Sequence, residues 1–314
     1  MPTDLWFGAF VWPEGTTFNE LKRLCQKAEA LKYDLFMITD HFMNMREPNR
    51  PDRHPLEAWT TLAGLAAVTS QIKLGPLVTC YAYRAPPVLA KMATTVDIIS
   101  NGRLVFGIGA GWHKQEFEDY FGRFPPVKER LTGLEEIVAI CKAMFSNERT
   151  TYNGTIFKVE NALNSPLPVQ RPIPVLIGGG GEKRTLKIAA RHANINHIFA
   201  NDLKTLDSKL EALKRHCTAI GRDYDEIRKG VGVAVVLGSD EKQAEARLTR
   251  LARTLGTSED SIRSELGDIY GTPEKVAGIL RQFVSRGIGL ITPRFFYQDE
   301  MELFANEVIP RIVQ

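Results

Sequence analysis

The stretch Gly102-Arg-Leu-Val-Phe-Gly-Ile-Gly-Ala-Gly-Trp-His-Lys-Gln-Glu116 joins an apolar run to a cluster of ring and polar side chains. Residues 104–108 form the run, which is typical of a strand buried on both faces of a parallel sheet. Glycines at the end of such a strand let a flat or phosphorylated group lie close to the backbone. The side chains expected in the loop before the next helix are those of Trp112, His113, Gln115 and Glu116. The stretch therefore predicts a strand that delivers side chains to a binding site, with a glycine-rich turn that binds nothing as the alternative.

Apolar runs of this kind recur along the chain, and each is followed by a helical pattern. Strands are expected at residues 5–11, 34–39, 72–78, 104–108, 173–177, 195–199, 230–237 and 289–296. An Asn153-Gly154 turn between β-forming residues predicts a hairpin insertion at about 149–161, and a helical insertion is expected at about 240–271. Eight strand-then-helix units favour a (β/α)8 TIM barrel over an open doubly wound sheet, as a single domain over residues 1–314.

The composition is that of an ordinary globular protein, with 44% hydrophobic and 25% charged residues in 314. A formal net charge of +3 gives no reason to expect nucleic acid or a membrane surface as a partner. The four cysteines show neither a C-x-x-C pair nor zinc-ligand spacing, which is typical of reduced thiols in a cytosol. The N-terminus has no leader-like pattern, and no apolar run is long enough to span a membrane. We expect a cytoplasmic protein.

In a TIM barrel the active site lies at the carboxyl ends of the strands, so the residues there are the candidates. Asp40-His41 is the most promising acid/base pair, because a histidine titrates near neutrality, although His41 could instead only hold the neighbouring loop. The run Gly178-Gly-Gly-Gly181, followed by Lys183 and Arg184, predicts a phosphate cradle at a helix N-terminus or else a plain turn. His113 and Glu116 have no third ligand nearby, so no metal site is expected.

Six segments together resemble the luciferase-like monooxygenase superfamily. They are Ile38-Thr-Asp-His-Phe, Leu74-Gly-Pro-Leu-Val-Thr, Arg84-Ala-Pro-Pro-Val-Leu-Ala-Lys, Thr95-Val-Asp-Ile-Ile-Ser-Asn-Gly-Arg-Leu, Gly107-Ile-Gly-Ala-Gly-Trp and Pro174-Val-Leu-Ile-Gly-Gly-Gly-Gly. The resemblance covers residues 5 to about 200 well. The Asp-His-Phe and Gly-Ala-Gly-Trp segments are most similar to the branch that uses the deazaflavin coenzyme F420, and a flavin mononucleotide (FMN) branch shares the same barrel.

The resemblance implies roles for individual residues. Asp40 and His41 would lie beside the reactive face of the deazaflavin, and a bulge at Leu77-Val78, often with a cis peptide, would back the ring. Further cofactor contacts are implied for Thr79, Cys80, Trp112, Gln115, Glu116, Gly178, Gly179, Gly180 and Gly181, the last four at the phosphate. Cys80 stands where the family often has a hydroxyl. Trp112 departs from the sugar-phosphate dehydrogenase branch, which has a glutamate there.

The resemblance thus predicts an oxidoreductase that transfers a hydride between coenzyme F420 and a small organic substrate. His41 would donate or accept the proton, and Glu116 would orient it or act as a second acid/base group. A flat apolar pocket is expected from Trp12, Trp112, Phe295 and Phe296, and Arg46, Arg50 and Arg53 could meet an acidic cofactor tail. The alternatives are an FMN-dependent monooxygenase that receives reduced flavin from a separate reductase and, more remotely, a non-catalytic flavin-binding barrel. The family also suggests a homodimer.

Overall fold

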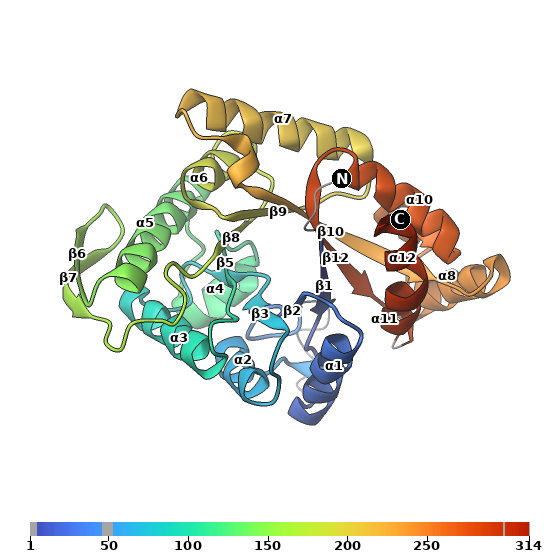
Figure 1. The fold of residues 1–314 in the computed structure, drawn as a ribbon, viewed down its shortest axis with the longest axis horizontal. Coiled ribbons are helices and arrows are strands. Elements are labelled where there is room, and N and C mark those ends of the chain that lie inside the picture. Colours follow the sequence, from blue (N-terminus) through green and yellow to red (C-terminus); the bar gives the residue numbers. More distant parts are fainter. Residues whose placement is uncertain (1–4, 46–52, 298, 314) are drawn as a thin grey trace.

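Parallel strands that form a barrel make up the centre of the protein (Figure 1). The structure, a computed structural model, describes residues 5–45, 53–297 and 299–313, so Arg46 and Arg50 lie outside the described residues. In spatial order the strands are β3 (Lys73–Pro76), β2 (Leu35–Ile38), β1 (Trp6–Val11), β12 (Ile288–Phe295), β10 (Arg228–Leu237), β9 (Ile195–Phe199), β8 (Val175–Gly178), β5 (Phe106–Gly109) and β4 (Thr79–Cys80).

The two ends of this path, β3 and β4, belong to one extended segment that Leu77 and Val78 interrupt. β3 pairs with β2 and β4 pairs with β5, and a further parallel bridge joins Leu74 to Leu104. The segment therefore occupies one position in the ring and closes it. The predicted TIM-barrel fold is confirmed, with the third predicted strand divided into two.

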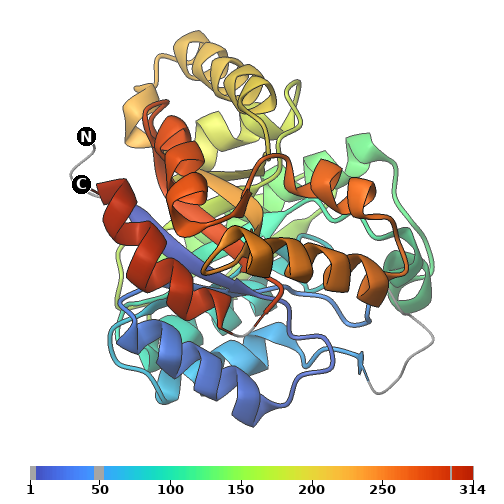
Figure 2. The same cartoon turned by 90° about the vertical axis from the view of Figure 1, so that its right-hand side faces the viewer.

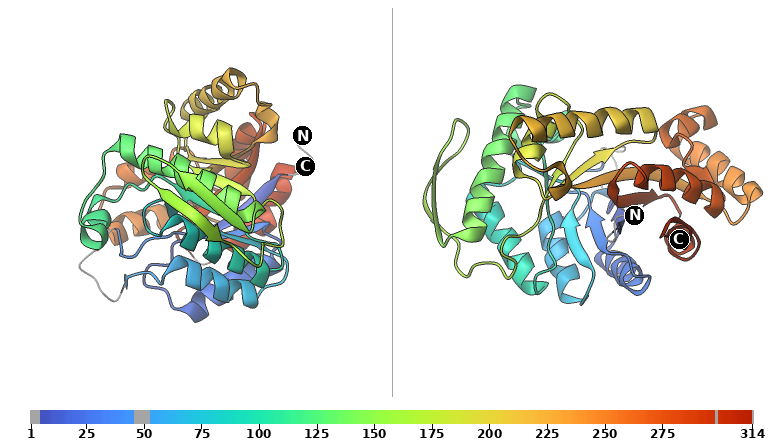
Figure 3. Two further views of the ribbon diagram at one scale, coloured as in Figure 1. Left: turned by 90° about the vertical axis from the view of Figure 1, so that its left-hand side faces the viewer. Right: turned by 45° about the horizontal axis from the view of Figure 1, so that its top comes forward.

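Helices surround the barrel in the alternating order that the sequence predicts (Figures 1 and 3). They are α1 (Phe18–Ala30), α2 (Ala58–Ala67), α3 (Pro86–Ile99), α5 (Val127–Ser146), α6 (Thr185–His192), α7 (Leu203–Ala219) and α10 (Pro273–Val284). Local sequence fixes where they begin: Thr17 and Glu20 form a capping box at α1, and Pro86 occupies the first turn of α3. Their apolar faces pack on the outside of the strands in one continuous core.

Several elements lie outside this alternation. The antiparallel hairpin β6 (Arg149–Asn153) and β7 (Lys158–Leu163) packs against α5 and α3, as the left view of Figure 3 shows. After β10 come α8 (Glu241–Leu255), α9 (Glu259–Leu266) and β11 (Tyr270–Gly271), of which α8 and α9 pack on β10 (Figure 2). α4 (Lys114–Phe121) follows β5, and a short turn of helix, η2 (Tyr224–Glu226), precedes β10.

The C-terminal elements are tied to the barrel by one buried carboxylate. They are α11 (Glu300–Leu303), η3 (Phe304–Val308) and α12 (Ile309–Val313), which lie beside α1 in Figure 2. Glu300 accepts hydrogen bonds from the backbone N–H groups of Leu237, Phe296 and Tyr297, at 2.8, 2.8 and 3.0 Å. These donors stand at the ends of β10 and β12, so the side chain joins the last helices to both strands.

At the opposite, amino-terminal end of the barrel, Arg103 donates hydrogen bonds to backbone oxygens of three segments. Its guanidinium donates to the carbonyls of Ala66, Thr69 and Ile72 and to the hydroxyl of Thr69, while Nε donates to Ser100. The last carbonyls of a helix have no partner within the helix. Arg103 supplies one for the end of α2 and thereby joins α2, the start of β3 and the approach to β5.

Candidate active site

A cavity of about 330 Å³ opens at the carboxyl ends of β2, β4, β5, β8 and β9, and we call it the barrel pocket. It contains most of the cofactor-binding residues predicted from the sequence. Its lining residues are Asp40, His41, Leu77, Val78, Thr79, Cys80, Tyr83, Gly109, Ala110, Gly111, Trp112, Gly178, Gly179, Gly180, Gly181, Thr185, His197 and Phe199. Gln115 and Glu116 do not line it: Gln115 is exposed on α4, and Glu116 is buried behind His41.

His41 and Glu116 form an acid/base pair that joins two elements far apart in sequence. Nδ1 of His41 lies 2.7 Å from Oε2 of Glu116, which is 0% exposed, while the imidazole reaches the pocket. The carboxylate thus fixes a hydrogen on Nδ1 and leaves Nε2 as the nitrogen that can give or take a proton. The ring also lies edge-to-face with the half-exposed Trp112, at a centroid distance of 5.9 Å.

Two further donors hold the Glu116 carboxylate. The backbone N–H of Phe42 donates to Oε1 at 2.5 Å, and the hydroxyl of Tyr83 donates to Oε2. Burial alone would favour the neutral acid, but the hydrogen bonds from His41, Tyr83 and Phe42 outweigh it and hold the pKa of Glu116 below its usual range. The pKa of Tyr83 is raised, first by burial and then by the neighbouring acidic groups, so the phenol stays protonated as a donor.

The position of Glu116 depends on α4, which begins earlier than the sequence suggests. The pattern predicts residues 112–116 in a loop, whereas α4 begins at Lys114, so Gln115 and Glu116 stand in its first turn. His113 is the N-cap, and its Nδ1 accepts from the backbone N–H of Glu116 at 3.3 Å. Burial, ahead of nearby charges, lowers the pKa of His113, which suits this acceptor role. His113 is therefore a helix cap, and Gln115 points away from the pocket because it lies beside Glu116 on the other face.

Asp40 does not contact its neighbour His41 as an acid/base partner; it pairs with Arg84. The guanidinium donates to both carboxylate oxygens of Asp40, at 2.6 and 3.0 Å, and Arg84 also binds Glu57, the N-cap of α2. Thr79 donates its hydroxyl to Asp40 and accepts from the indole of Trp59 at 3.3 Å. Asp40 is 1% exposed, so this network replaces the water that its charge would otherwise need.

The segment Leu77-Val78 forms the wall between β3 and β4, and the peptide bond between these residues is cis. The Val78 side chain lies over glycines of the two neighbouring strands. A Cβ atom at Gly109 would lie 2.7 Å from Val78, and one at Gly178 would lie 2.9 Å from it. Larger residues at either position would displace Val78, so these glycines are needed for packing as well as for access.

The segment Gly178–Gly181 connects β8 to α6 and lines the pocket with backbone alone. The N–H of Gly179, where φ is 121°, donates to the carbonyl of His197 at 2.9 Å. Among the described residues, no partner engages the N–H groups of Gly180 and Gly181, and the Thr185 hydroxyl lies beside them. A second cavity that shares Gly181 and Thr185 is also lined by the basic residues Arg130, Lys183 and Arg184. The arrangement suits an anionic group bound by amides near cationic side chains.

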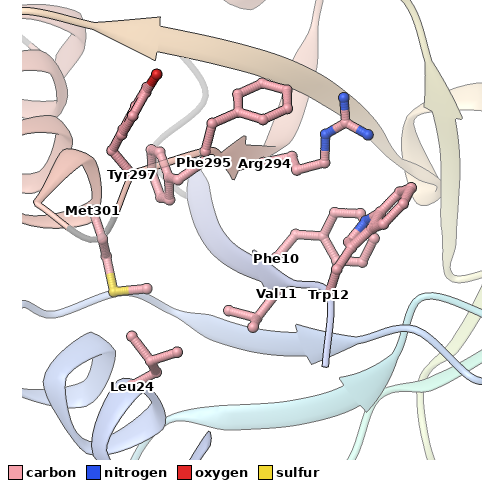
Figure 4. Close-up of a pocket in the computed structure, with 9 residues that line it drawn as sticks. Phe10, Val11, Trp12, Leu24, Arg294, Phe295, Tyr297 and Met301 are labelled. Carbon is pink, nitrogen blue, oxygen red and sulfur yellow. The ribbon is translucent and has the colours of Figure 1, made fainter. Parts of the chain in front are cut away.

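The aromatic residues predicted to form one pocket are divided between two. Trp12, Phe295 and Phe296 line a separate cavity of about 280 Å³ at the ends of β1 and β12, the aromatic pocket (Figure 4), whereas Trp112 lines the barrel pocket. The remaining lining residues are Phe10, Val11, Leu24, Arg294, Tyr297 and Met301. Phe10 and Phe199 lie between the two cavities, with ring centroids 6.2 Å apart.

Four residues of the site were not predicted as such: Glu57, Tyr83, Arg84 and, as a binding residue, His197. Arg84 opens one of the segments that carry the family resemblance, and it directly precedes the proline-led α3, so its position after β4 was the available signal. Tyr83 stands in the same short connection. Glu57 had no signal beyond its place before a helix.

The similarity to known proteins extends over most of the barrel. A family model described as luciferase-like monooxygenase matches residues 6–289. The chain belongs to this oxidoreductase family. An uncharacterised protein of Mycobacterium tuberculosis is 30% identical over 280 residues, which is 89% of this chain and 87% of the relative. The pyrimidine monooxygenase RutA of Pantoea ananatis is 29% identical over 244 residues, 74% of this chain and 63% of the relative.

Among solved structures, the coenzyme F420 dependent tetrahydromethanopterin reductase of Methanopyrus kandleri superimposes with a TM-score of 0.81 at 21% identity. The alignment covers 99% of this chain and 100% of that one, and it shows the shared fold. Within the described residues, no helix has the length and apolarity to cross a membrane. The same residues contain no group of three or more His, Cys, Asp or Glu side chains placed to hold a metal ion.

Proposed function

We propose that this protein is a coenzyme F420-dependent oxidoreductase that transfers a hydride between the deazaflavin and a small organic substrate. The observation that carries the proposal is the buried Glu116 carboxylate that fixes His41 at the edge of the barrel pocket. Hydride transfer to or from a carbonyl, imine or activated alkene requires a proton at the neighbouring atom. His41 Nε2 is the group that would supply or remove it.

The chain's own atoms fit such a cofactor. Glycines at positions 109, 111 and 178–181 leave a side-chain-free slot, which a flat ring system requires. The free amides of Gly180 and Gly181 would bind the phosphate, and Arg130 and Lys183 would bind further negative charge. Asp40, Leu77, Val78, Thr79, Cys80 and Trp112 also line the pocket and would contact the ring. When bound, the deazaflavin supplies the hydride.

Each residue then has a defined task. Glu116 is an orienting group, since its contact is with Nδ1 and not with the pocket. Asp40 and Arg84 join the end of β2 to the connection between β4 and α3 and so fix the backbone just before His41. The apolar walls exclude water from the slot.

The second candidate function is an FMN-dependent monooxygenase that uses dioxygen and a separate reductase. The family description and the likeness to RutA favour it. FMN ends in a phosphate, so Gly180 and Gly181 suit it equally well, whereas the basic residues beyond Gly181 suit the longer acidic tail of F420 better.

The test is titration of the purified protein with F420 and with FMN, followed by fluorescence. Micromolar binding of F420 and much weaker binding of FMN would support the proposal. A screen of alcohols, ketones and enals for substrate-dependent loss or gain of the deazaflavin absorption would follow. Tight binding of FMN, with oxygen consumption by the reduced complex, would favour the monooxygenase and exclude the hydride transfer proposed here.

A further inference from the structure

His197 lines the barrel pocket although it is only 1% exposed. It stands on β9, opposite Gly178 of β8 and Gly230 of β10. Nothing in the proposed reaction uses it. Its Nδ1 is nevertheless a buried polar atom without a hydrogen-bond partner among the described residues. Buried polar atoms are nearly always satisfied, so an unpartnered one in a pocket wall needs an explanation.

The imidazole of His197 reaches across β10 to Thr292 on β12, with 2.6 Å between Nε2 and the threonine hydroxyl. Two glycines of β10 make room for it. A Cβ atom at Gly230 would lie 3.2 Å from Cδ2, and one at Gly232 would lie 2.9 Å from Cε1. Gly232 is nearer the carboxyl end of β10, so the edge of the ring that carries Cε1 and Nδ1 is turned toward the mouth of the barrel. Nδ1 therefore faces the pocket.

The hydrogen bonds of Thr292 indicate which nitrogen carries the hydrogen. The threonine hydroxyl also lies 3.3 Å from the carbonyl of Val231, to which it can donate. If Nε2–H donates to Thr292 and Thr292 donates to Val231, both hydrogens are bonded and only the acceptor Nδ1 is left. With the hydrogen on Nδ1 instead, one of these bonds is lost and a donor is buried without a partner, which is the less favourable arrangement.

The ring is also held in its neutral form. Burial lowers the pKa of His197 to about 3, since no charged side chain offsets the loss of water. A neutral imidazole with hydrogen on Nε2 offers a lone pair at Nδ1 and nothing else. Phe199 lies edge-to-face with the ring, at a centroid distance of 5.3 Å.

We propose that Nδ1 of His197 is a fixed hydrogen-bond acceptor for a hydroxyl or N–H group of the molecule bound in the barrel pocket. The inference rests on the proposed function only in taking this pocket as the ligand site. Because the ring does not ionise in the neutral pH range, it selects a neutral donor group and rejects a carboxylate or carbonyl oxygen at the same place. The backbone of His197 accepts from Gly179, so the acceptor and the glycine segment are held in fixed relation.

The donor can belong to either of two molecules. Flavins and deazaflavins carry a ring imide N–H and ribityl hydroxyls, and a substrate could carry an alcohol or an amide. The pocket wall formed by Gly178–Gly181 runs directly beside His197, so either molecule would reach Nδ1 while lying against the glycine segment. The shared chemistry, a donor directed at an imidazole lone pair, is what the structure assigns.

The tautomer and its response to ligands are measurable by long-range ¹H–¹⁵N spectroscopy of protein with ¹⁵N-labelled histidine. The chain has 6 histidines, and the His197→Phe variant identifies the signals of His197. We expect the free protein to show the neutral form with hydrogen on Nε2. F420 and FMN are then added separately, and uracil and 2-propanol are added to the resulting complex. A shift of Nδ1 on addition of the cofactor assigns the donor to the cofactor, and a shift only on addition of a probe assigns it to the substrate.

Hydrogen on Nδ1, a protonated ring, or an Nδ1 signal that none of the bound molecules moves would overturn the proposal. If neither cofactor binds, the proposed function fails. The role of His197 is then still decided by its tautomer in the free protein and by its response to the two probes. Affinity provides a second measurement. His197→Phe should weaken binding of the responding molecule about tenfold, while His197→Asn, whose amide oxygen can replace Nδ1, should keep most of it. Thermal unfolding checks that both variants are folded. Equal losses of affinity in the two folded variants would show that the ring of His197 contributes packing only.

Discussion

The imidazole of His41 and the carboxylate of Glu116 lie 2.7 Å apart, although 74 residues separate them in the chain between β2 and α4. This contact joins the loop after β2 to the helix after β5. Because Glu116 also receives the N–H of Phe42, it fixes both the ring and the backbone next to it. The helix that His113 caps thereby helps to determine where the His41 ring points.

Glu116→Gln should lower the turnover of the substrate found in the screen by about 10²–10³-fold, since positioned acid–base catalysis contributes on the order of 10²–10⁴. The amide keeps the size of the side chain but can present its NH2 group to Nδ1, which moves the hydrogen of neutral His41 to Nε2. Binding of F420 should stay within about twofold, because Glu116 does not line the pocket. The control is Gln115→Ala, in the same helical turn and exposed. Similar losses in both variants would contradict the assigned role.

Arg84→Met should destabilise the protein by about 3–5 kcal/mol, because it leaves Asp40 buried without its cation. Urea unfolding followed by circular dichroism measures the change. Arg123→Met is the matched control, since Arg123 binds Glu129 at the surface with 64% of its side chain exposed. Its removal should change the free energy of unfolding far less than Arg84→Met does, because solvent screens an exposed ion pair. Comparable costs for the two variants would show that the Asp40 pair is no more important than a surface pair.

Gly179→Ala should weaken binding of a phosphate-bearing cofactor by about tenfold or more, because Gly179 has φ 121° and alanine is strained there by roughly 1–3 kcal/mol. The strain would shift the amides of Gly180 and Gly181. Comparing FMN with riboflavin isolates the phosphate contact, and riboflavin should lose less. Gly221→Ala is the control, since Gly221 also has a positive φ, of 67°, but lies on the surface away from the barrel pocket. A larger effect on riboflavin than on FMN would place the phosphate elsewhere.

Glu300 should make the protein less stable as the pH rises. Burial, which outweighs the three backbone donors, raises the pKa of Glu300 from 4.5 to about 7 in the folded state. A carboxyl whose pKa is raised by folding contributes its full stability below the unfolded value and loses it as the pH rises through the folded value. Ionisation of Glu300 should thus cost about 3 kcal/mol between pH 4.5 and 8, at about 1.4 kcal/mol for each pKa unit.

Glu29 provides the comparison for this prediction. It also accepts three backbone N–H groups, from Ser70, Gln71 and Ile72, but it is only partly buried. Burial again favours the neutral acid, yet here the hydrogen bonds outweigh it and lower the pKa. Relative to Glu300→Gln, the wild-type free energy of unfolding should fall between pH 5 and pH 8, while relative to Glu29→Gln it should stay constant. A constant difference for both variants would refute the raised pKa of Glu300.

The fold was predictable because each barrel strand is a short apolar run at regular spacing, and hydrophobic periodicity reports burial directly. The division of the third strand did not follow from the apolar pattern of residues 72–78, but the family resemblance implied it through the bulge at Leu77-Val78, where the peptide bond is cis. α4 was not predicted: its capping residue is a histidine, which lies outside the usual set of Ser, Thr, Asp and Asn. Gln115 was assigned to the cofactor through the family resemblance, whereas in the structure it is exposed on α4.

The candidate site was predictable where it follows from strand ends, as for His41 and Gly178–Gly181. It was not predictable where a partner is distant in sequence. Adjacent placement suggested that Asp40 and His41 act together, but successive residues point in different directions, and each found its partner on another element, Arg84 and Glu116. The role of His197 depends on two glycines of β10 and on Thr292, a relation that only the closed barrel creates.

The contacts of Arg103, at the amino-terminal end of the barrel, affect how this protein could change over evolutionary time. The guanidinium joins three segments on the side away from the pocket, so the integrity of the ring there does not depend on the residues that meet a ligand. Residues at the carboxyl ends of the strands can therefore change, and with them the substrate, without altering the contacts that Arg103 makes. Such a separation suits a fold that a reductase and a monooxygenase share, and it makes the carboxyl ends of the strands the natural place to engineer new specificity.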